Sequence, residues 1–226
     1  MKRSSRRTLL LVLFVTALAL IIAGFAGLDR WFYENVSLKT NVDTNLSKSF
    51  YHQTRWLWDA ARWIGHPLGV GLGLIAVTLL HPRSWRIAVL LGIAILITDT
   101  AGYLAKGTIS RIRPNQSQSQ LAFAAPFSGF TSSDDVKTSF PSGEATAAFA
   151  LSAGLAIAAP GYGWLFYLLA GLCAAARLVA GAHYLSDVTA GVLLGVWLTN
   201  GCYAALQNAA IFARLNGAQG TETPVR

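Results

Sequence analysis

Six apolar runs, separated by more polar segments, limit what this chain of 226 residues can fold into. A helix needs about 18–20 mainly apolar residues to cross the hydrocarbon core of a bilayer, and several of the runs approach or exceed that length. Because 54% of the residues are hydrophobic and only 12% are charged, a membrane protein fits better than a soluble domain with a large core. We therefore predict an all-α, polytopic membrane protein with six transmembrane helices. The expected spans are 8–27, 63–80, 87–105, 144–159, 164–181 and 187–207.

The first apolar run follows a basic flank, residues 1–7. A basic start before an apolar run is also typical of a cleaved signal peptide, which is the alternative interpretation. We favour a retained span, because its length of about 20 residues exceeds the usual signal core and the count of the later spans needs it.

Residues 28–62 are mixed in character and rich in tryptophan. Tryptophan is enriched where protein meets the membrane–water interface. The segment is therefore either an amphipathic helix that lies on the membrane or a connecting loop at headgroup depth. Both interpretations place it at a membrane surface.

Three short polar signatures lie between Lys106 and Asp187. In the first, Lys106 and Arg113 are seven residues apart, so a continuous helix would place both on one face. Pro114 would then close that helix. An ammonium group and a planar guanidinium together suit the several oxygens of a phosphate. The alternative is ordinary positive charge beside a span, and Arg111, which falls off this face, is expected to be solvated or to bind headgroups.

The second signature, Pro141-Ser142-Gly143-Glu144, predicts a turn that opens the fourth span. Glycine lets a backbone amide approach an anion closely, and a helix N-terminus offers unpaired N–H groups and a favourable dipole. Ser142 can add its hydroxyl as a donor. Ser142 and Gly143 are therefore candidate phosphate-binding residues, and the alternative is an ordinary helix cap made by the serine side chain.

The third signature holds Arg177, His183 and Asp187. His183 and Asp187 are one helical turn apart. An aspartate that accepts a hydrogen bond from one imidazole nitrogen fixes the tautomer and leaves the other nitrogen free to attack phosphorus. Arg177, near the end of the fifth span, either joins the phosphate site or snorkels toward the interface. The order of the three signatures on one predicted face favours a phosphate-processing site.

With these residues the chain resembles the PAP2 superfamily, the type 2 phosphatidic acid phosphatases, over residues 63–207. The family motifs are written K-x6-R-P, P-S-G-H and S-R-x5-H-x3-D. The matching residues are Lys106, Arg113 and Pro114 for the first motif and Arg177, His183 and Asp187 for the third, with Ala176 in place of its serine. The resemblance implies a six-helix, PAP2-like bundle that forms a phosphohistidine without a metal or another cofactor. By this resemblance His183 is the nucleophile, Asp187 orients it, and Lys106, Arg113, Ser142, Gly143 and Arg177 bind the phosphate.

Glu144 stands where the family has a histidine that protonates the leaving group. One hypothesis is that Glu144 supplies this proton from a half-buried site, although nearby arginines would oppose it. A second hypothesis is that the substrate has a leaving oxygen that departs easily, as in a lipid diphosphate or a glycosyl phosphate. The alternative to both is a first-turn acid that the helix dipole favours.

The distribution of lysine and arginine predicts the orientation of the chain, since cytoplasmic loops carry an excess of both. Six spans place both termini on one side, and basic residues crowd the N-terminal flank and the loop at 81–86. We therefore predict an inner-membrane protein with cytoplasmic termini and all three signatures at the periplasmic face. The expected organisation is an N-terminal span with an interfacial periplasmic segment (1–62), a catalytic core (63–207) and a short cytoplasmic tail (208–226).

Composition also excludes some function classes. The net charge of +8 does not indicate nucleic-acid binding, because the basic residues are scattered between apolar runs and no binding module is visible. His52, His66 and His81 show no metal-ligand spacing, so no metal is expected. Cys173 and Cys202 lie in apolar runs, where packing is expected and a disulfide is not.

The sequence therefore predicts a lipid phosphatase whose partners are the bilayer and a lipid with a phosphate or diphosphate headgroup. Candidate substrates are undecaprenyl diphosphate, a lipid A phosphate and phosphatidylglycerol phosphate. Two alternatives stay open. One is a lipid phosphotransferase that uses the same site, and the other is a lipid-phosphate binding or transport protein with impaired catalysis.

Overall fold

The structure is a computed structural model that describes residues 3–38, 45–80, 85–116, 119–131 and 138–208. Its regular elements are helices, and within the described ranges extended backbone pairs only at two isolated bridges, Arg111 with Phe123 and Ile112 with Thr138. The prediction of an all-α fold is therefore confirmed. The expected cytoplasmic tail lies outside the described residues from position 209 onward.

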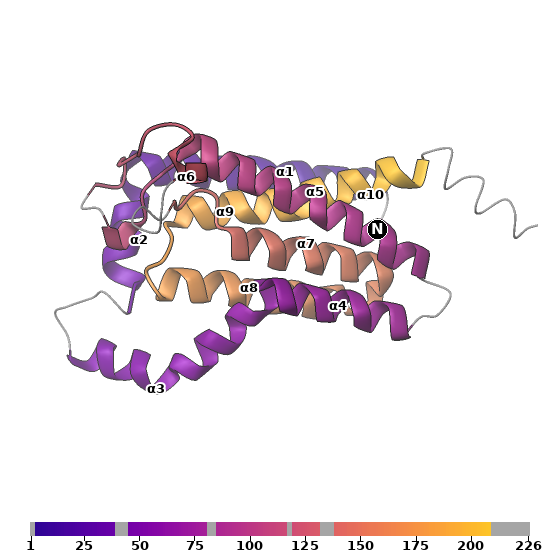
Figure 1. Ribbon diagram of the computed structural model, residues 1–226, viewed down its shortest axis with the longest axis horizontal. Coiled ribbons are helices and arrows are strands. Elements are labelled where there is room, and N and C mark those ends of the chain that lie inside the picture. The colour runs from indigo at the N-terminus through magenta and orange to yellow at the C-terminus, as the bar shows by residue number, and fades with distance from the viewer. Residues whose placement is uncertain (1–2, 39–44, 81–84, 117–118, 132–137, 209–226) are drawn as a thin grey trace, which may run out of the picture.

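The helices follow one another along the chain as the apolar runs predict (Figure 1). The N-terminal half contains α1 (Arg3–Ala23), a π-helical turn (Gly24–Leu28), α2 (Asp29–Val36), α3 (Asn45–Arg62), a 3-10 turn (Trp63–Gly65), α4 (Pro67–Leu80) and α5 (Trp85–Ile109). The C-terminal half contains two short helices (Pro114–Gln116 and α6, Ser128–Thr131), α7 (Gly143–Ala158), a 3-10 turn (Pro160–Tyr162), α8 (Gly163–Val179), α9 (Leu185–Leu193), a second π-helical turn (Leu194–Leu198) and α10 (Thr199–Asn208).

Four helical segments in the described part of the chain are long and apolar enough to cross a membrane. They are Leu11–Val36, Ala88–Ile109, Pro160–Val179 and Leu185–Leu206. Two of the expected spans, 63–80 and 144–159, correspond to shorter apolar helices, Pro67–Ala76 and Gly143–Ala158. The protein is an integral membrane protein by these helices, and a count of six spans stays a prediction.

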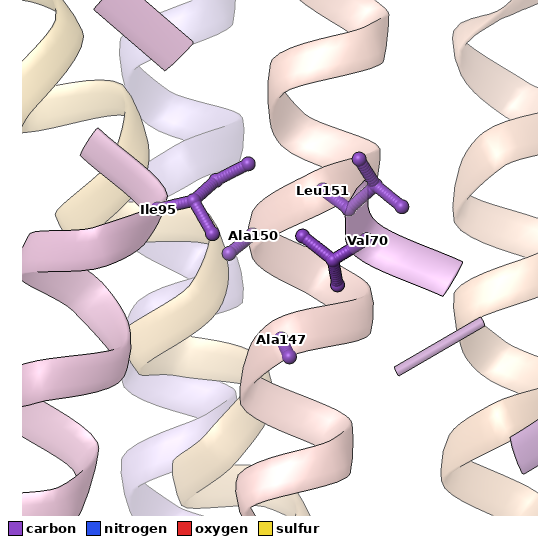
Figure 2. Packing of buried hydrophobic residues seen from close by; sticks show 5 residues of the cluster. All are labelled: Val70, Ile95, Ala147, Ala150 and Leu151. Carbon is purple, nitrogen blue, oxygen red and sulfur yellow. The ribbon is translucent and has the colours of Figure 1, made fainter. Parts of the chain in front are cut away.

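Helix α7 is the centre of the bundle and packs against α4, α5, α8 and α9. Its sequence is rich in alanine, and small side chains let neighbouring helices approach closely. In Figure 2, Val70 of α4 and Ile95 of α5 pack against Ala147, Ala150 and Leu151 of α7, and all five are buried. The core of the membrane-embedded bundle is therefore built around one helix with mainly small side chains, α7.

The contact between α7 and α9 is especially close at Gly191. A Cβ atom placed on Gly191 would lie 2.7 Å from the carbonyl oxygen of Ser142, so glycine is required there. The N-terminal end of α7 is thereby held against α9, the helix that carries Asp187.

The ends of four helices meet at one end of the bundle (Figure 1). Helix α8 ends at Val179, and Gly181 then adopts a left-handed conformation with φ 60° that turns the chain toward α9. Asp187 caps the start of α9 by accepting a hydrogen bond from the backbone N–H of Tyr184 at 2.8 Å. The C-terminal ends of α5 and α8 and the N-terminal ends of α7 and α9 therefore share one end of the molecule.

The tryptophan-rich segment is helical, as one of the two interpretations expected. Residues 29–36 and 45–62 form α2 and α3, and α3 runs along α8 at an angle to the bundle (Figure 1). Trp56 and Phe50 are exposed on α3, whereas Tyr51 and Ala61 are buried. The placement of α3 at the membrane surface stays a prediction.

Candidate active site

Most of the predicted site residues line one pocket of about 320 Å³ at the shared helix ends. These are Lys106, Arg113, Gly143, Glu144, Arg177 and His183. Ser142 and Asp187 are fully buried beside the pocket residues. The structure thus brings together residues from all three signatures, which lie up to 81 positions apart in the chain.

The imidazole of His183 has a defined tautomer. Its Nδ1 lies 2.9 Å from the backbone carbonyl oxygen of Ser139, and a carbonyl oxygen can only accept a hydrogen bond. Nδ1 therefore carries the proton, and Nε2 keeps its lone pair. Burial lowers the pKa of His183 to about 4, against the opposing effect of Asp187, so the ring is neutral at ordinary pH.

Asp187 supports His183 less directly than the sequence predicts. Its Oδ2 lies 3.8 Å from Nδ1 of His183, beyond hydrogen-bond distance, and it accepts a hydrogen bond from the hydroxyl of Ser139. The hydrogen bond from Nδ1–H is therefore accepted by the backbone carbonyl oxygen of Ser139. Sequence reasoning missed this role because a backbone carbonyl leaves no signal in residue type.

Arg111 is fully buried, so the expectation of a solvated or headgroup-binding side chain is wrong. Its guanidinium donates to Asp187 at 2.7 Å and to Asp29 at 2.8 Å. The rings of Phe25 and Tyr184 lie 4.4 Å and 4.1 Å from its central carbon. Two carboxylates and two aromatic faces compensate the buried charge, which explains why it tolerates burial.

Asp29 is the second site residue that sequence reasoning missed. It is fully buried and accepts hydrogen bonds from the backbone N–H and the hydroxyl of Ser186 as well as from Arg111. Its position next to the first apolar run was the available signal, because an ionisable residue at membrane depth is functional by default. Asp29 in the first turn of α2 is thus hydrogen-bonded to Ser186 of α9, the residue before Asp187.

Ser142 occupies the N-cap position of α7, but its side chain makes no capping hydrogen bond. The alternative of an ordinary serine cap is therefore not supported. Within the described part of the chain, the hydroxyl of Ser142 and Nε of Arg177 are buried without a hydrogen-bond partner. Buried polar groups are rarely left unpaired, and both groups belong to the residues predicted to bind phosphate.

Lys106 and Arg113 reach the pocket in a different way from the one predicted. Helix α5 ends at Ile109, and Ser110 follows with φ 48°, so the expected continuous helix from Lys106 to Arg113 is wrong. Arg113 instead comes from the irregular segment beyond, where its Nε donates to the carbonyl oxygen of Thr138 at 3.4 Å. Burial lowers the pKa of Arg113 from its ordinary value, with the carboxylates of Glu144 and Asp187 opposing this shift.

Glu144 is held between two arginines. Arg62 donates to both of its carboxylate oxygens, at 3.1 Å and 3.0 Å, and Arg177 lies 3.0 Å from Oε2. The hydrogen bonds raise the pKa of Arg62 further, against partial burial. Sequence reasoning missed Arg62, which lies 82 residues from its partner in a segment that the tryptophans mark only as interfacial.

No cluster of three or more His, Cys, Asp or Glu side chains suited to a metal ion occurs among the described residues. Cys173 and Cys202 are free thiols. The Cys173 thiol contacts the carbonyl oxygens of Arg62 and Glu144 at 3.9 Å and 3.8 Å, so it packs where α8 meets the first turn of α7.

The chain is similar to known proteins in sequence. The chain is 35% identical over 132 residues to a lipid A 1-phosphatase from Rhizobium johnstonii and 33% identical over 132 residues to one from Rhizobium etli. Each alignment covers 58% of this chain, and the chain spans about half the length of these relatives, 50% and 52%.

A solved structure has the same fold. It is the crystal structure of a transmembrane PAP2-type phosphatidylglycerolphosphate phosphatase from Bacillus subtilis, with a TM-score of 0.51 and 19% sequence identity. The superposition covers 96% of this chain and 98% of that one. The model of the PAP2 superfamily matches residues 84–211, more than half of the sequence, so this chain belongs to the PAP2 superfamily.

Proposed function

We propose that the protein is a membrane lipid phosphatase that transfers the phosphoryl group of a lipid phosphate or diphosphate to His183 and then to water. One observation carries the proposal. The hydroxyl of Ser142 and Nε of Arg177, which have no hydrogen-bond partner among the described residues, belong to the same site as a neutral imidazole whose Nε2 keeps its lone pair. Anion-binding donors and a nucleophile are what phosphoryl transfer to a histidine requires.

The reaction would proceed in two displacement steps. In the first, Nε2 of His183 attacks phosphorus, the P–N bond forms, and the bond from phosphorus to the lipid oxygen breaks. In the second, water attacks phosphorus, the P–N bond breaks, and inorganic phosphate leaves. Over both steps one water molecule supplies the hydroxyl of the released phosphate and the proton of the lipid product. The overall reaction therefore needs no reactant besides the lipid and water.

Positive groups would stabilise the charge that develops on the phosphoryl oxygens. Lys106, Arg113 and Arg177 line the pocket, and Gly143 lies at the N-terminal end of α7. A helix N-terminus adds backbone N–H groups that point at an anion. A Cβ atom placed on Gly143 would lie 3.8 Å from Nζ of Lys106, so the ammonium group is close to that helix end.

Of the two hypotheses for Glu144, the geometry favours the one based on the leaving group. Both oxygens of Glu144 face guanidinium groups, which stabilise the ionised carboxylate and leave no proton to donate. A substrate whose leaving oxygen departs easily needs an acid least. Glycosyl phosphates, in which an anomeric sugar oxygen departs, and lipid diphosphates meet this condition better than simple alkyl phosphates.

The names of the relatives support the same choice of substrate. Both Rhizobium proteins are named lipid A 1-phosphatases, and a 1-phosphate on a sugar is a glycosyl phosphate. We therefore propose a glycosyl phosphate of the lipid A type as the first substrate to test, ahead of undecaprenyl diphosphate. On the positive-inside argument, six spans would place the termini in the cytoplasm and the site at the periplasmic face.

A phosphate-release panel with purified protein tests the proposal. Lipid A carrying a 1-phosphate, undecaprenyl diphosphate, phosphatidylglycerol phosphate and phosphatidate are compared at equal surface concentration, with His183→Ala as the control. We expect release from the first two to exceed release from phosphatidate, and acid-labile, base-stable phosphate on the wild-type protein alone. Release by His183→Ala at the wild-type rate contradicts the role of His183.

A second comparison separates the two hypotheses for Glu144. If Glu144 supplies the proton, Glu144→Ala should lower release from the alkyl phosphate more than release from the glycosyl phosphate, because the alkoxide needs the acid more. Equal loss on both would show that Glu144 is not the proton donor, as the leaving-group hypothesis expects. Transfer of phosphate to an added lipid hydroxyl in place of water would assign the phosphotransferase activity, and binding without either product would assign a binding protein.

A further inference from the structure

A second cavity, of about 550 Å³, lies between α3 and the C-terminal end of α8. Its volume falls within the range of about 300–1,000 Å³ that is usual for small-molecule sites. It shares Arg113 and Arg177 with the catalytic pocket, so these two side chains border both spaces. No step of the reaction described above uses the rest of this cavity.

The α3–α8 cavity carries an excess of positive charge. Its lining contains four arginines, Arg55, Arg62, Arg113 and Arg177, and the single acid Asp59. Glu144 of the catalytic pocket pairs with two of these arginines, so the four positive charges face two carboxylates. Asp59 pairs with Arg55 at 3.3 Å, but both side chains are about half exposed, and such a pair holds its partners weakly. The remaining positive charge favours an anionic ligand.

Arg177 connects this cavity with the catalytic pocket. Its side chain is only 7% exposed, it lines both spaces, and its Nε has no partner among the described residues. Nη1 is paired with Glu144, so the guanidinium retains a buried donor for a second acceptor. A phosphate oxygen in either space is an acceptor of the kind that guanidinium groups bind best.

Apolar and aromatic side chains also line the cavity. They are Leu38, Tyr51 and Trp58, of which the last two lie on α3 with Arg55 and Arg62. Aromatic side chains with a polar edge suit ligands that are themselves amphipathic. A bare anion would need none of this surface, whereas a sugar that carries a phosphate would use both the charged and the aromatic side chains.

The helix that forms this cavity is fixed against the catalytic residues. A Cβ atom placed on Gly65 would lie 2.1 Å from the carbonyl oxygen of Glu144, so the turn after α3 rests directly on the first turn of α7. Arg62, the last residue of α3, then reaches Glu144 with two hydrogen bonds. The cavity is thus formed by packed elements and not by a loose helix.

We propose that the α3–α8 cavity is a second anion-binding subsite, which holds a further phosphate on the sugar headgroup while the catalytic pocket holds the phosphate to be removed. This assignment rests on the lipid phosphatase function proposed above and narrows its substrate to a headgroup with two phosphates. Arg55 and Arg62 are its specificity-determining residues. Glu144 keeps Arg62 compensated in the free protein, and the second phosphate competes with Glu144 for that guanidinium.

Two probes that differ in one group test the subsite. Lipid A with two phosphates and lipid A with the 1-phosphate alone present the same scissile bond, and their affinities for the His183→Ala protein in nanodiscs are compared. We expect the first to bind about tenfold more tightly, which is the effect of one charge-assisted hydrogen bond. Arg55→Gln and Arg62→Gln should each reduce this ratio toward one.

Arg30→Gln is the matched control, because Arg30 forms an i,i+4 ion pair with Glu34 on α2 as Arg55 does with Asp59 on α3. It should leave the ratio of the two affinities unchanged. Equal binding of both probes, or an undiminished ratio in both the Arg55→Gln and the Arg62→Gln proteins, overturns the subsite. Measuring two variants protects the test against misfolding of one.

Inorganic phosphate alone distinguishes a lipid-borne group from released product. If submillimolar phosphate abolishes the preference for the first probe, the cavity binds product and the proposal is wrong. Phosphate release by wild-type protein is measured separately. If the protein prefers the probe with two phosphates but releases no phosphate, the proposed phosphatase function is refuted and the subsite is retained. If it releases phosphate but binds both probes equally, only the subsite is refuted.

Discussion

The guanidinium of Arg111 donates a hydrogen bond to the carboxylate of Asp187 at 2.7 Å, and neither side chain is exposed. The same guanidinium holds Asp29, which belongs to α2. Asp187 in turn accepts from Ser139, whose carbonyl oxygen fixes the tautomer of His183. The orientation of the proposed nucleophile therefore depends on α2, which precedes the part of the chain that matches the family model.

Replacing Arg111 should destabilise the protein strongly. Arg111→Gln leaves the carboxylates of Asp29 and Asp187 buried without their cation, and loss of one member of a buried ion pair costs about 3–5 kcal/mol. Thermal unfolding in detergent measures this change. The exposed pair of Arg30 with Glu34 provides the control, since Arg30→Gln should cost only about 0–1 kcal/mol.

A double variant identifies the cause of that loss. Adding Asp29→Asn to Arg111→Gln removes one of the two uncompensated charges, so part of the stability should return. Arg111→Gln that unfolds at the temperature of Arg30→Gln would show that the buried network contributes little.

Ser142→Ala should separate stability from activity. The hydroxyl of Ser142 is buried and makes no capping bond, so its removal breaks no interaction of the described protein and relieves the cost of an unpaired polar group. The melting temperature should stay the same or rise, while phosphate release falls about tenfold through loss of one hydrogen bond to the phosphate. A lower melting temperature with unchanged release would assign Ser142 a purely structural role.

The burial of His183 should make folding stability depend on pH. Its pKa is about 4 in the folded protein, against 6.5 for an exposed histidine. Above pH 6.5 neither state is protonated, but as pH falls from 6.5 to 4 the unfolded chain binds a proton that the folded protein does not. Wild-type protein should therefore lose stability across this window.

His183→Gln removes this titration and keeps an amide donor for the carbonyl oxygen of Ser139. The difference in melting temperature between wild type and His183→Gln should be constant above pH 6.5. Below pH 6.5 the melting temperature of wild type should fall more than that of His183→Gln. Activity is the poorer measure here, because a phosphate monoester itself titrates near pH 6. A difference that stays constant down to pH 4 would place the pKa of His183 near its ordinary value.

Introducing an acid at position 144 should broaden the substrate range. Glu144→His restores the residue of the family motif and provides a proton donor, and general acid catalysis is worth about 10²–10⁴-fold for a leaving group that needs it. The gain should be large for phosphatidate, whose leaving oxygen is an alkoxide, and small for a glycosyl phosphate. Glu144→Gln, which loses the charge and adds no acid, is the control.

Equal gains on both lipids in the Glu144→His protein would mean that leaving-group chemistry does not explain the glutamate. In that case its contacts with Arg62 and Arg177 would carry the whole explanation.

The pocket residues could be predicted from the sequence for a physical reason. Each signature lies where an apolar run begins or ends, and alternating spans bring such ends to one side of a bundle. Lys106 and Arg113 line one pocket even though the helix expected to connect them ends at Ile109. The error concerned local backbone conformation, whereas the apolar runs, whose ends carry the signatures, correspond to helices of the structure.

What the sequence determined by itself is the helical class, the positions of the apolar helices and the set of residues that line one pocket at the helix ends. Those properties follow from hydrophobic periodicity and motif spacing, which are local. Only the tertiary structure decided that Arg111 is paired with Asp29 and that Arg62 is paired with Glu144, since the partners are 82 residues apart in both pairs. A long-range ion pair depends on how helices pack and on which charges that packing removes from water. Neither property produces a repeating pattern in the sequence.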